Sequence, residues 1–101
     1  MRLVWSPLAI ARAAEAAAFI AGDKPEAARR WLEGLLECVD RLQQFPHSGR
    51  VLPEIGSPEY REIPYRSHRV IYKVQKSTVA ILTVRHSKQR FDSAEMPTEK
   101  S

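Results

Sequence analysis

The sequence predicts one α+β domain, in which an N-terminal strand and a helical hairpin precede an antiparallel sheet of about four or five strands. Three observations lead to this prediction: the chain has 101 residues, its first half carries apolar residues at helical spacing, and its second half carries short β-branched runs bounded by turn residues. A chain of this length builds a single hydrophobic core. We therefore expect one domain over residues 1–91, followed by a loose polar tail over residues 92–101.

The N-terminal residues predict a strand that leads directly into a helix. Residues 2–5 have the composition of a short strand, and Ser6 then has the position of a helix N-cap. Pro7 follows at the first helical position, where its missing backbone N–H costs nothing. An alanine-rich helix is therefore expected to run to Ile20, and Gly22 is placed to end it in a left-handed conformation.

A second helix is predicted after a very short connection, so the two helices are expected to pack antiparallel. Asp23 is its expected N-cap, Glu26 completes a capping box, and Pro46 ends the helix. Its apolar residues recur at spacings of three and four and form one broad face: Trp31, Leu32, Leu35, Leu36, Val39, Leu42 and Phe45. The single cysteine, Cys38, falls within this pattern and is expected to be a buried structural thiol.

The second half of the chain predicts the sheet that covers the helices. Four runs have strand composition: residues 51–54, 60–63, 69–75 and 79–85. The short link Lys76-Ser77-Thr78 joins the last two as a hairpin. The run from Val79 to Val84 is almost entirely apolar or β-branched, so we expect either a central strand that is covered on both faces or a strand that lies against the helices.

The positive charge of the protein is concentrated in the predicted sheet. The whole chain has a net charge of +4, and between residues 61 and 90 the only acidic residue is Glu62. The basic residues of this region are Arg61, Arg66, Arg69, Lys73, Lys76, Arg85, Lys88 and Arg90. We expect these strands to present an outward cationic surface that meets nucleic acid, an acidic protein, or both.

Nothing in the sequence predicts contact with a membrane. The apolar runs fall short of the roughly 20 residues that cross a bilayer, and residues 1–10 lack the basic and apolar regions of a signal peptide. A cytoplasmic protein is therefore expected. The three histidines do not have the spacing of a metal site, and we expect no cofactor.

Four segments resemble motifs of the RelE/ParE superfamily of bacterial toxins. Residues 45–50, Phe-Pro-His-Ser-Gly-Arg, resemble the turn after the second helix of these toxins, and residues 60–63, Tyr-Arg-Glu-Ile, resemble one of their strands. Residues 68–74 resemble their strand "YRVIYxV", and residues 81–86 with Arg90 resemble their ending "ILxVxHxxR". The similarity spans about residues 3–91, and the predicted order of strand, helical hairpin and arginine-rich strands is that of the same fold.

The resemblance implies a toxin of a type II toxin–antitoxin module, held inactive in a hetero-oligomer by a cognate antitoxin. An acidic antitoxin segment is expected to order on the cationic strands and to neutralise them. The superfamily contains two kinds of toxin. ParE-like members inhibit DNA gyrase, whereas RelE-like members are metal-independent endoribonucleases that cut messenger RNA on the ribosome.

The ribonuclease alternative requires cations that hold the phosphate and a group that takes the 2′-OH proton. By resemblance, the candidate catalytic residues are Arg61, Arg69, Arg85, His86 and Arg90. Arg69 and Arg85 would hold the phosphate, with Arg90 as the alternative to Arg85. His86 would transfer the proton, with Glu54 as a more distant candidate. Arg61 stands where those enzymes carry the first lysine of a pair.

The same residues also allow structural interpretations. Arg69 has Glu62 and Glu54 as potential partners across the sheet, and His86 is equally suited to a hydrogen-bonded strand end. Ile63 takes the position of the second lysine, and no tyrosine follows the last strand to match the terminal tyrosine of the ribonucleases. This incomplete set favours ParE-like inhibition of gyrase, and a basic nucleic-acid-binding module is the third interpretation.

Overall fold

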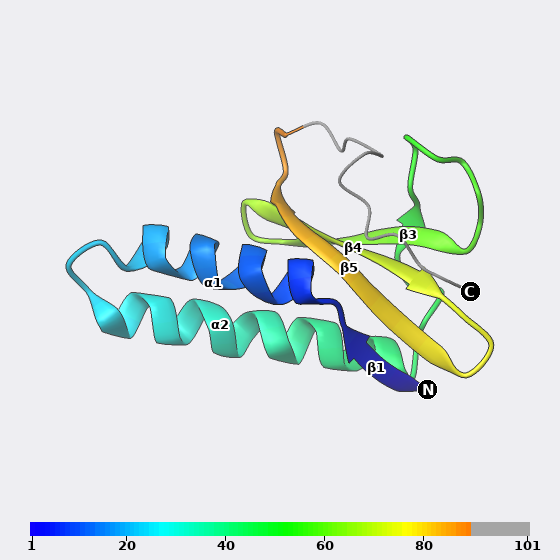
Figure 1. The fold of residues 1–101 in the computed structure, drawn as a ribbon, viewed down its shortest axis with the longest axis horizontal. Helices are drawn as coiled ribbons and strands as arrows, with labels where there is room; N and C mark the ends of the chain where they lie inside the picture. The colour runs from blue at the N-terminus through cyan, green and yellow to red at the C-terminus, as the bar shows by residue number, and fades with distance from the viewer. Residues whose placement is uncertain (90–101) are drawn as a thin grey trace.

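The structure, a computed structural model, describes residues 1–89 as a helical hairpin packed on a five-stranded sheet (Figure 1). In chain order the elements are β1 (Arg2–Trp5), α1 (Pro7–Ala21), α2 (Pro25–Asp40), the 3₁₀ turn η1 (Arg41–Gln43), β2 (Arg50–Val51), β3 (Tyr60–Tyr65), β4 (His68–Val74) and β5 (Thr78–His86). The predicted α+β architecture is confirmed. No helix within residues 1–89 is both long and apolar enough to span a bilayer. The predicted end of the domain and the tail at residues 92–101 lie outside the described residues.

The strands lie in the order β1-β5-β4-β3-β2, so the first and last strands of the chain are neighbours. Strands β2 to β5 form antiparallel pairs, whereas β1 runs parallel to β5 with Leu3 opposite Val79. The sheet is therefore mixed: four antiparallel strands gain a parallel edge strand. β5 has a neighbour on each side and is buried at Val79 and at residues 81–84, which confirms the predicted central strand.

Ser6 begins α1 and also fastens this helix to the sheet. Its Oγ accepts a hydrogen bond from the Ala9 N–H at 3.0 Å and donates one to the Leu82 carbonyl at 2.8 Å, so the predicted N-cap is confirmed. The helix ends at Ala21, and Gly22 adopts the expected positive φ, at 49°. Its ψ of −114° departs from the left-handed helical conformation that we expected, in which ψ is about +47°.

The predicted start of the second helix is wrong by one residue. Lys24, not Asp23, is the N-cap of α2, and its side chain makes no capping hydrogen bond. Pro25 is the first helical residue because its fixed φ suits that position, which leaves Asp23 outside the helix. Glu26 forms no capping box and pairs instead with Arg29 at 3.1 Å.

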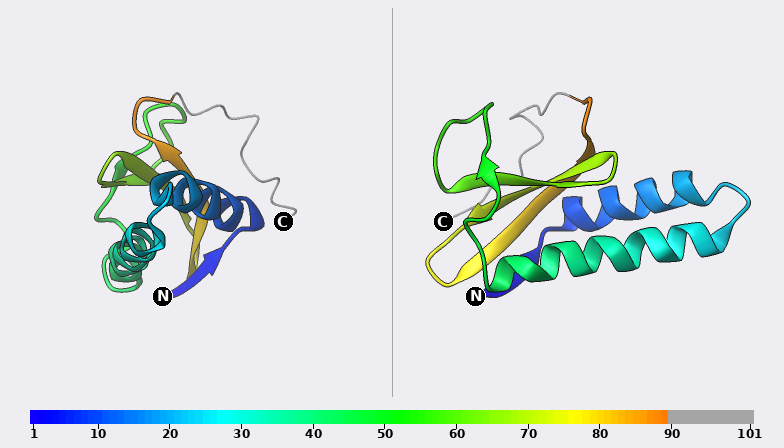
Figure 2. Two further views of the ribbon diagram at one scale, coloured as in Figure 1. Left: turned by 90° about the vertical axis from the view of Figure 1, so that its left-hand side faces the viewer. Right: turned by 180° about the vertical axis from the view of Figure 1, so that it is seen from behind.

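The buried stripe of α2 is narrower than the predicted face. The fully buried residues of α2 are Trp31, Leu35 and Val39, and Leu42 is fully buried in the 3₁₀ turn that follows. Leu36 remains 54% exposed because it is rotated by about 100° from Leu35 around the helix axis, and Phe45 remains 61% exposed. The far end of the helical hairpin also projects past the sheet (Figures 1 and 2), so the strands cover only part of the helices.

The predicted strand at residues 51–54 is mostly a turn. β2 comprises only Arg50 and Val51, because the chain turns after Leu52, whose carbonyl accepts the N–H groups of Ile55 at 3.1 Å and Gly56 at 2.8 Å. The other three predicted strands agree with β3, β4 and β5 to within two residues at each end.

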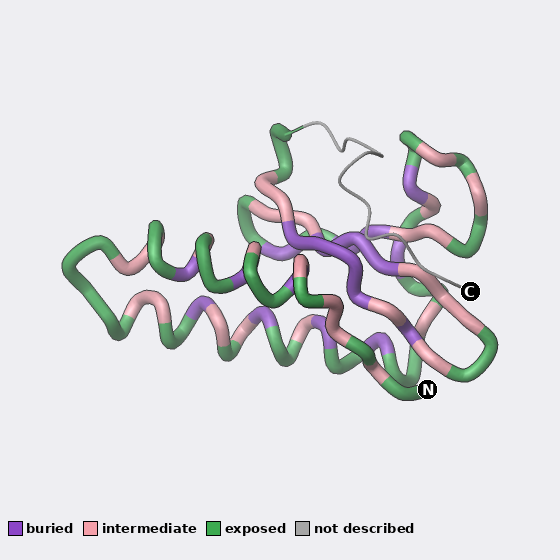
Figure 3. Tube along the Cα trace, viewed as in Figure 1, coloured by how far each residue is buried: buried purple, intermediate pink, exposed green. Residues whose placement is uncertain are grey.

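Both faces of the sheet bury apolar side chains. The inner face, which is the face toward the helices, holds the main core; in Figure 3 the buried positions gather on β4, β5 and the helices. The outer face holds a smaller cluster of Leu52, Ile71 and Leu82. Cys38 is half-buried, not fully buried as we expected, with its Sγ 3.8 Å from the Pro64 carbonyl oxygen, and burial raises the pKa of its thiol. A raised pKa disfavours the reactive thiolate, in keeping with the structural role that we expected.

Gly34 allows Tyr65 of β3 to pack directly against α2. A Cβ atom at residue 34 would lie 2.3 Å from the Tyr65 Oη and 3.2 Å from its Cζ. The Tyr65 hydroxyl donates to the Trp31 carbonyl at 2.7 Å, and the two rings meet edge-on at 5.5 Å between centroids. A side chain at residue 34 would therefore break the contact between α2 and β3.

We expect Gly34→Ala to lower the free energy of unfolding by about 2 kcal/mol, because the new methyl group displaces the Tyr65 ring. In an ordinary helix interior the same change raises stability by roughly 1 kcal/mol, so the sign of the effect is diagnostic. Chemical denaturation followed by circular dichroism measures it. In a Tyr65→Phe background, which lacks the nearest oxygen, Gly34→Ala should cost clearly less; an equal cost in both backgrounds would contradict the contact.

Candidate functional site

The guanidinium of Arg69 is held by two carboxylates on the outer face of the sheet. Its Nη1 donates to Glu62 at 2.8 Å, and its Nη2 donates to Glu54 at 2.8 Å and to the Gln89 carbonyl at 2.9 Å. Burial opposes the charged form of Arg69, but the two carboxylates outweigh this effect and raise its pKa. Arg69 therefore makes both of the cross-sheet ion pairs that the sequence suggested.

Glu62 is the buried centre of this ion-pair network, with only 4% of its side chain exposed. Arg50, its register partner on β2, donates to its second oxygen. The turn before Arg50 packs tightly on β3, because a Cβ atom at Gly49 would lie 2.5 Å from the Glu62 carbonyl oxygen and 2.6 Å from the Tyr72 Oη. Gly49 and Arg50, the last two residues of the motif at residues 45–50, thus have a structural role.

Arg61 fastens two loops to the edge of the sheet. Its Nε donates to the Pro58 carbonyl at 2.9 Å, and its Nη1 donates to the Gly49 carbonyl at 2.9 Å and the His47 carbonyl at 3.3 Å. These bonds engage Arg61 with the backbone of its own chain. The predicted cationic surface is therefore reduced where Arg61 and Arg69 lie.

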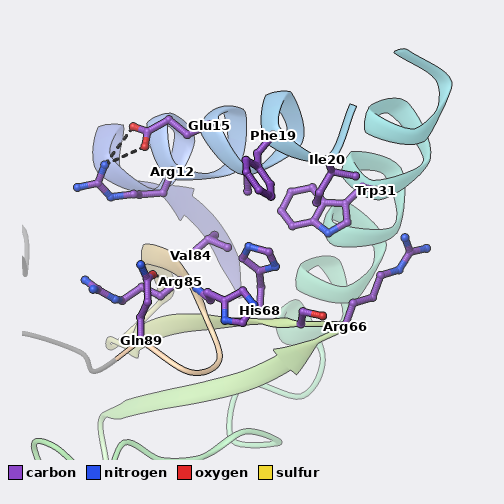
Figure 4. A pocket seen from close by; sticks show the side chains of 13 residues that line it. Arg12, Glu15, Phe19, Ile20, Trp31, Arg66, His68, Val84, Arg85 and Gln89 are labelled. Atoms are coloured by element: carbon purple, nitrogen blue, oxygen red, sulfur yellow. Dashed lines mark hydrogen bonds and ion pairs between the residues drawn. The ribbon is translucent and has the colours of Figure 1, made fainter. Parts of the chain in front are cut away.

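Two of the predicted site residues, Arg85 and His86, line an open groove of about 690 Å³ beside α1 (Figure 4). Its walls come from α1, from Trp31 of α2, from the β3–β4 turn, and from the end of β5 with the residues that follow. Apolar and cationic side chains share this groove: Ala16, Phe19, Ile20, Trp31 and Val84, with Arg12, Arg66 and Arg85. The one carboxylate among its lining residues, Glu15, pairs with Arg12 at 3.0 Å.

A pair of histidines lies in the same groove. His68 and His86 are register partners on β4 and β5, with ring centroids 5.3 Å apart, and the Trp31 ring lies 5.2 Å from the His68 ring. The Nδ1 of His86 accepts the Lys88 N–H at 3.2 Å, whereas the Nδ1 of His68 is buried and has no hydrogen-bond partner among residues 1–89. Burial, and secondarily the neighbouring His86, lower the pKa of His68.

Arg66 is a site residue that the sequence did not single out. It is the first of the two residues that join β3 to β4, and its φ is 52°, a conformation that costs a residue with a Cβ atom roughly 1–2 kcal/mol. Its guanidinium lies over the Tyr65 ring at 5.4 Å. Arg66 lines both the groove and a second hollow of about 380 Å³ that Arg50 and Arg69 also line. Only the strand register, which is a long-range property, would have revealed this tight turn.

The predicted catalytic residues do not gather at one point. Arg69 and Arg85 are register partners, and His86 is next to Arg85, but Arg61 holds loops on the far side of β4. Arg90 lies outside the described residues. Within residues 1–89, no cluster of three His, Cys, Asp or Glu side chains is placed to hold a metal ion.

We expect Arg69→Leu to lower the free energy of unfolding by about 3 kcal/mol, because it leaves the buried Glu62 carboxylate with one partner instead of two. Arg50 is the matched control, since it pairs with the same carboxylate while its own side chain is 70% exposed. Arg50→Ala should cost less than about 1 kcal/mol. Equal losses for the two variants in denaturant unfolding would argue against Arg69 as the main partner of Glu62.

Acidification is expected to destabilise the fold through His68. Because its pKa is lowered in the folded state, the unfolded chain, in which a histidine titrates near pH 6.5, binds the proton more readily. This contribution to stability is fully present above about pH 7 and is lost progressively as the pH falls from the unfolded pKa through the lower folded pKa. The unfolding free energy should therefore drop more between pH 7.5 and pH 5.5 in the wild type than in His68→Phe. Parallel profiles for the two proteins would rule out this histidine as the cause.

Comparison with known proteins places this fold in a family. A family model described as ParE toxin of type II toxin-antitoxin system, parDE, matches residues 3–91. The Sinorhizobium fredii protein described as "Putative toxin Y4kP" is 33% identical over 92 residues, which cover 89% of this chain and 92% of that protein. A solved structure described as the chromosomal ParDE TA system from P. aeruginosa has the same fold, with a TM-score of 0.73 and 22% identity over 85% of this chain and 95% of that one. The chain therefore belongs to the ParE family of toxins of type II toxin–antitoxin systems.

Proposed function

We propose that this toxin inhibits DNA gyrase and that a cognate antitoxin neutralises it in a hetero-oligomer. Membership of the ParE family supplies the toxin–antitoxin context. The observation that carries the choice of target is the state of Arg69, the residue that would clamp the phosphate in a ribonuclease of this fold. Its two terminal nitrogens are engaged by Glu54, Glu62 and the Gln89 carbonyl.

A phosphate on Arg69 would have to displace one of these carboxylates. Glu62 is 4% exposed and Arg69 is 11% exposed, so separating the pair would leave a buried charge without its partner. Such a loss typically costs about 3–5 kcal/mol, which a bound RNA would have to offset. Arg61, the residue at the position of the first catalytic lysine, would also have to release the carbonyls that it now binds. This arrangement supports gyrase inhibition over RNA cleavage.

The ribonuclease alternative has one observation in its favour. Arg85 and His86 line the same groove as Arg66, so a proton-transfer group and cations are close together there. The Nδ1 of His86 accepts a hydrogen bond from the Lys88 N–H at 3.2 Å, which orients the ring in the groove. This set contains neither Arg61, which binds loop carbonyls, nor Arg69, which pairs with carboxylates on the outer face. A basic nucleic-acid-binding module remains the third proposal.

The antitoxin is the proposed occupant of the groove beside α1. Arg66 and the other arginines of the groove stand near apolar side chains, which suits an acidic segment that also carries apolar residues. Because such a segment would neutralise charge and cover the surface at once, binding and inhibition would be one event. The partner and the target both place the proposed activity in the cytoplasm.

We expect the purified toxin to inhibit negative supercoiling of relaxed plasmid by gyrase and to leave messenger RNA intact in a reconstituted translation reaction. Agarose gels measure the first result, and primer extension on the translated message measures the second. Preformed complex with the product of the adjacent reading frame is the control, and it should leave gyrase fully active. Ribosome-dependent cleavage together with unaffected supercoiling would reverse the assignment and make the chain a ribonuclease.

A further inference from the structure

The turn between β3 and β4 keeps an arginine where the backbone favours glycine. Tyr65 and His68 are register partners, so Arg66 and Ser67 form a two-residue hairpin loop. A positive φ at the first loop residue alone is the geometry of a type II′ turn, whose first central residue is usually glycine. Strained backbone of this kind persists most often where the side chain has a function.

The fold itself gains little from the Arg66 side chain. The residue is exposed, and its guanidinium rests over the Tyr65 ring at 5.4 Å. Within residues 1–89 no carboxylate forms an ion pair with it. This distinguishes Arg66 from Arg69, whose charge is neutralised inside the protein. Contacts within residues 1–89 therefore give no reason to keep an arginine at this strained position.

Arg66 stands at the boundary between two hollows and at the cationic rim of the larger one. Beyond it, the groove has an apolar side formed by Phe19, Ile20 and Val84 (Figure 4). Phe19 is 89% exposed, a large apolar surface for an unbound side chain. The only carboxylate in the lining, Glu15, is already paired with Arg12. An occupant of the groove must accordingly bring its own negative charge and its own apolar side chains.

We infer that Arg66 is an anchor for a carboxylate on an acidic, amphipathic segment of a partner protein that lies in this groove. The inference rests on the proposed function, since the antitoxin is the partner that would supply the segment. A nucleic acid fits less well, because stacking of successive bases needs several open aromatic faces, and of the two larger aromatic rings in the groove only Phe19 is open, whereas Trp31 is 2% exposed. The strained turn thus serves binding at the expense of stability.

The test separates strain from charge with two substitutions at residue 66. Arg66→Gly removes both the backbone strain and the charge. The Tm of this variant should therefore rise by a few degrees, and its affinity for the partner should fall at least tenfold. Arg66→Lys keeps the charge and the strain, so its Tm should match the wild type and its affinity should fall between the two. Arg30→Glu is the control, because Arg30 is exposed on α2 and lines neither hollow; both its Tm and its affinity should stay close to wild type.

The probes are the purified product of the adjacent reading frame and, separately, a fluorescent single-stranded RNA of twelve nucleotides, each titrated at several salt concentrations. For an anchoring ion pair, the salt dependence of partner binding should be weaker in Arg66→Gly than in the wild type. Unchanged partner affinity in Arg66→Gly would overturn the inference alone. A lower Tm for Arg66→Gly would overturn the premise of strain, and tight RNA binding that needs Arg66 would assign the groove to nucleic acid. A wild-type protein that fails to bind the partner would overturn the proposed function and this inference together.

Discussion

The buried carboxylate of Glu62 is the constraint on which the outer face of the sheet depends. Removing a carboxylate from water costs several kcal/mol unless cations and hydrogen bonds replace its hydration. Here the replacements come from β2 through Arg50 and from β4 through Arg69. Arg69 in turn reaches Glu54 in the loop after β2 and the Gln89 carbonyl beyond β5. One buried charge therefore determines how three strands, a loop and the chain after the last strand are joined.

This network changes the meaning of the motifs that reveal the family. Gly49 and Arg50 of the first motif, Arg61 and Glu62 of the second, and Arg69 of the third all make contacts that hold the sheet and its loops together. Motifs shared across a superfamily with two different activities are expected to encode the common architecture, and these contacts are of that kind. The residues that determine a specific activity are therefore expected on the surface outside these motifs.

The elements that local sequence determines were predictable, and those that depend on distant pairing were not. Ser6 caps α1 because the signal lies within four residues of chain. The missed cap at Asp23 shows how a neighbouring Pro25 overrides a favourable side chain. The parallel pairing of β1 with β5 and the positive φ of Arg66 follow from strand register, which no local pattern encodes. For the same reason the sequence identified the arginines of the sheet without revealing which of them are neutralised.

The two faces of the sheet consequently serve different purposes. On the outer face, burial and ion pairing use the charge of Arg69 to stabilise the fold. In the groove beside α1, by contrast, the protein keeps the strained Arg66 of the β3–β4 turn, the exposed Phe19 of α1, and His68 of β4, whose pKa is depressed. Each of these features lowers stability or solubility in the free protein, and a bound partner would relieve or cover them. Toxins of this kind are kept bound to an antitoxin until they act. Features that lower the stability of the free toxin therefore persist, because the toxin is held mainly in the bound state.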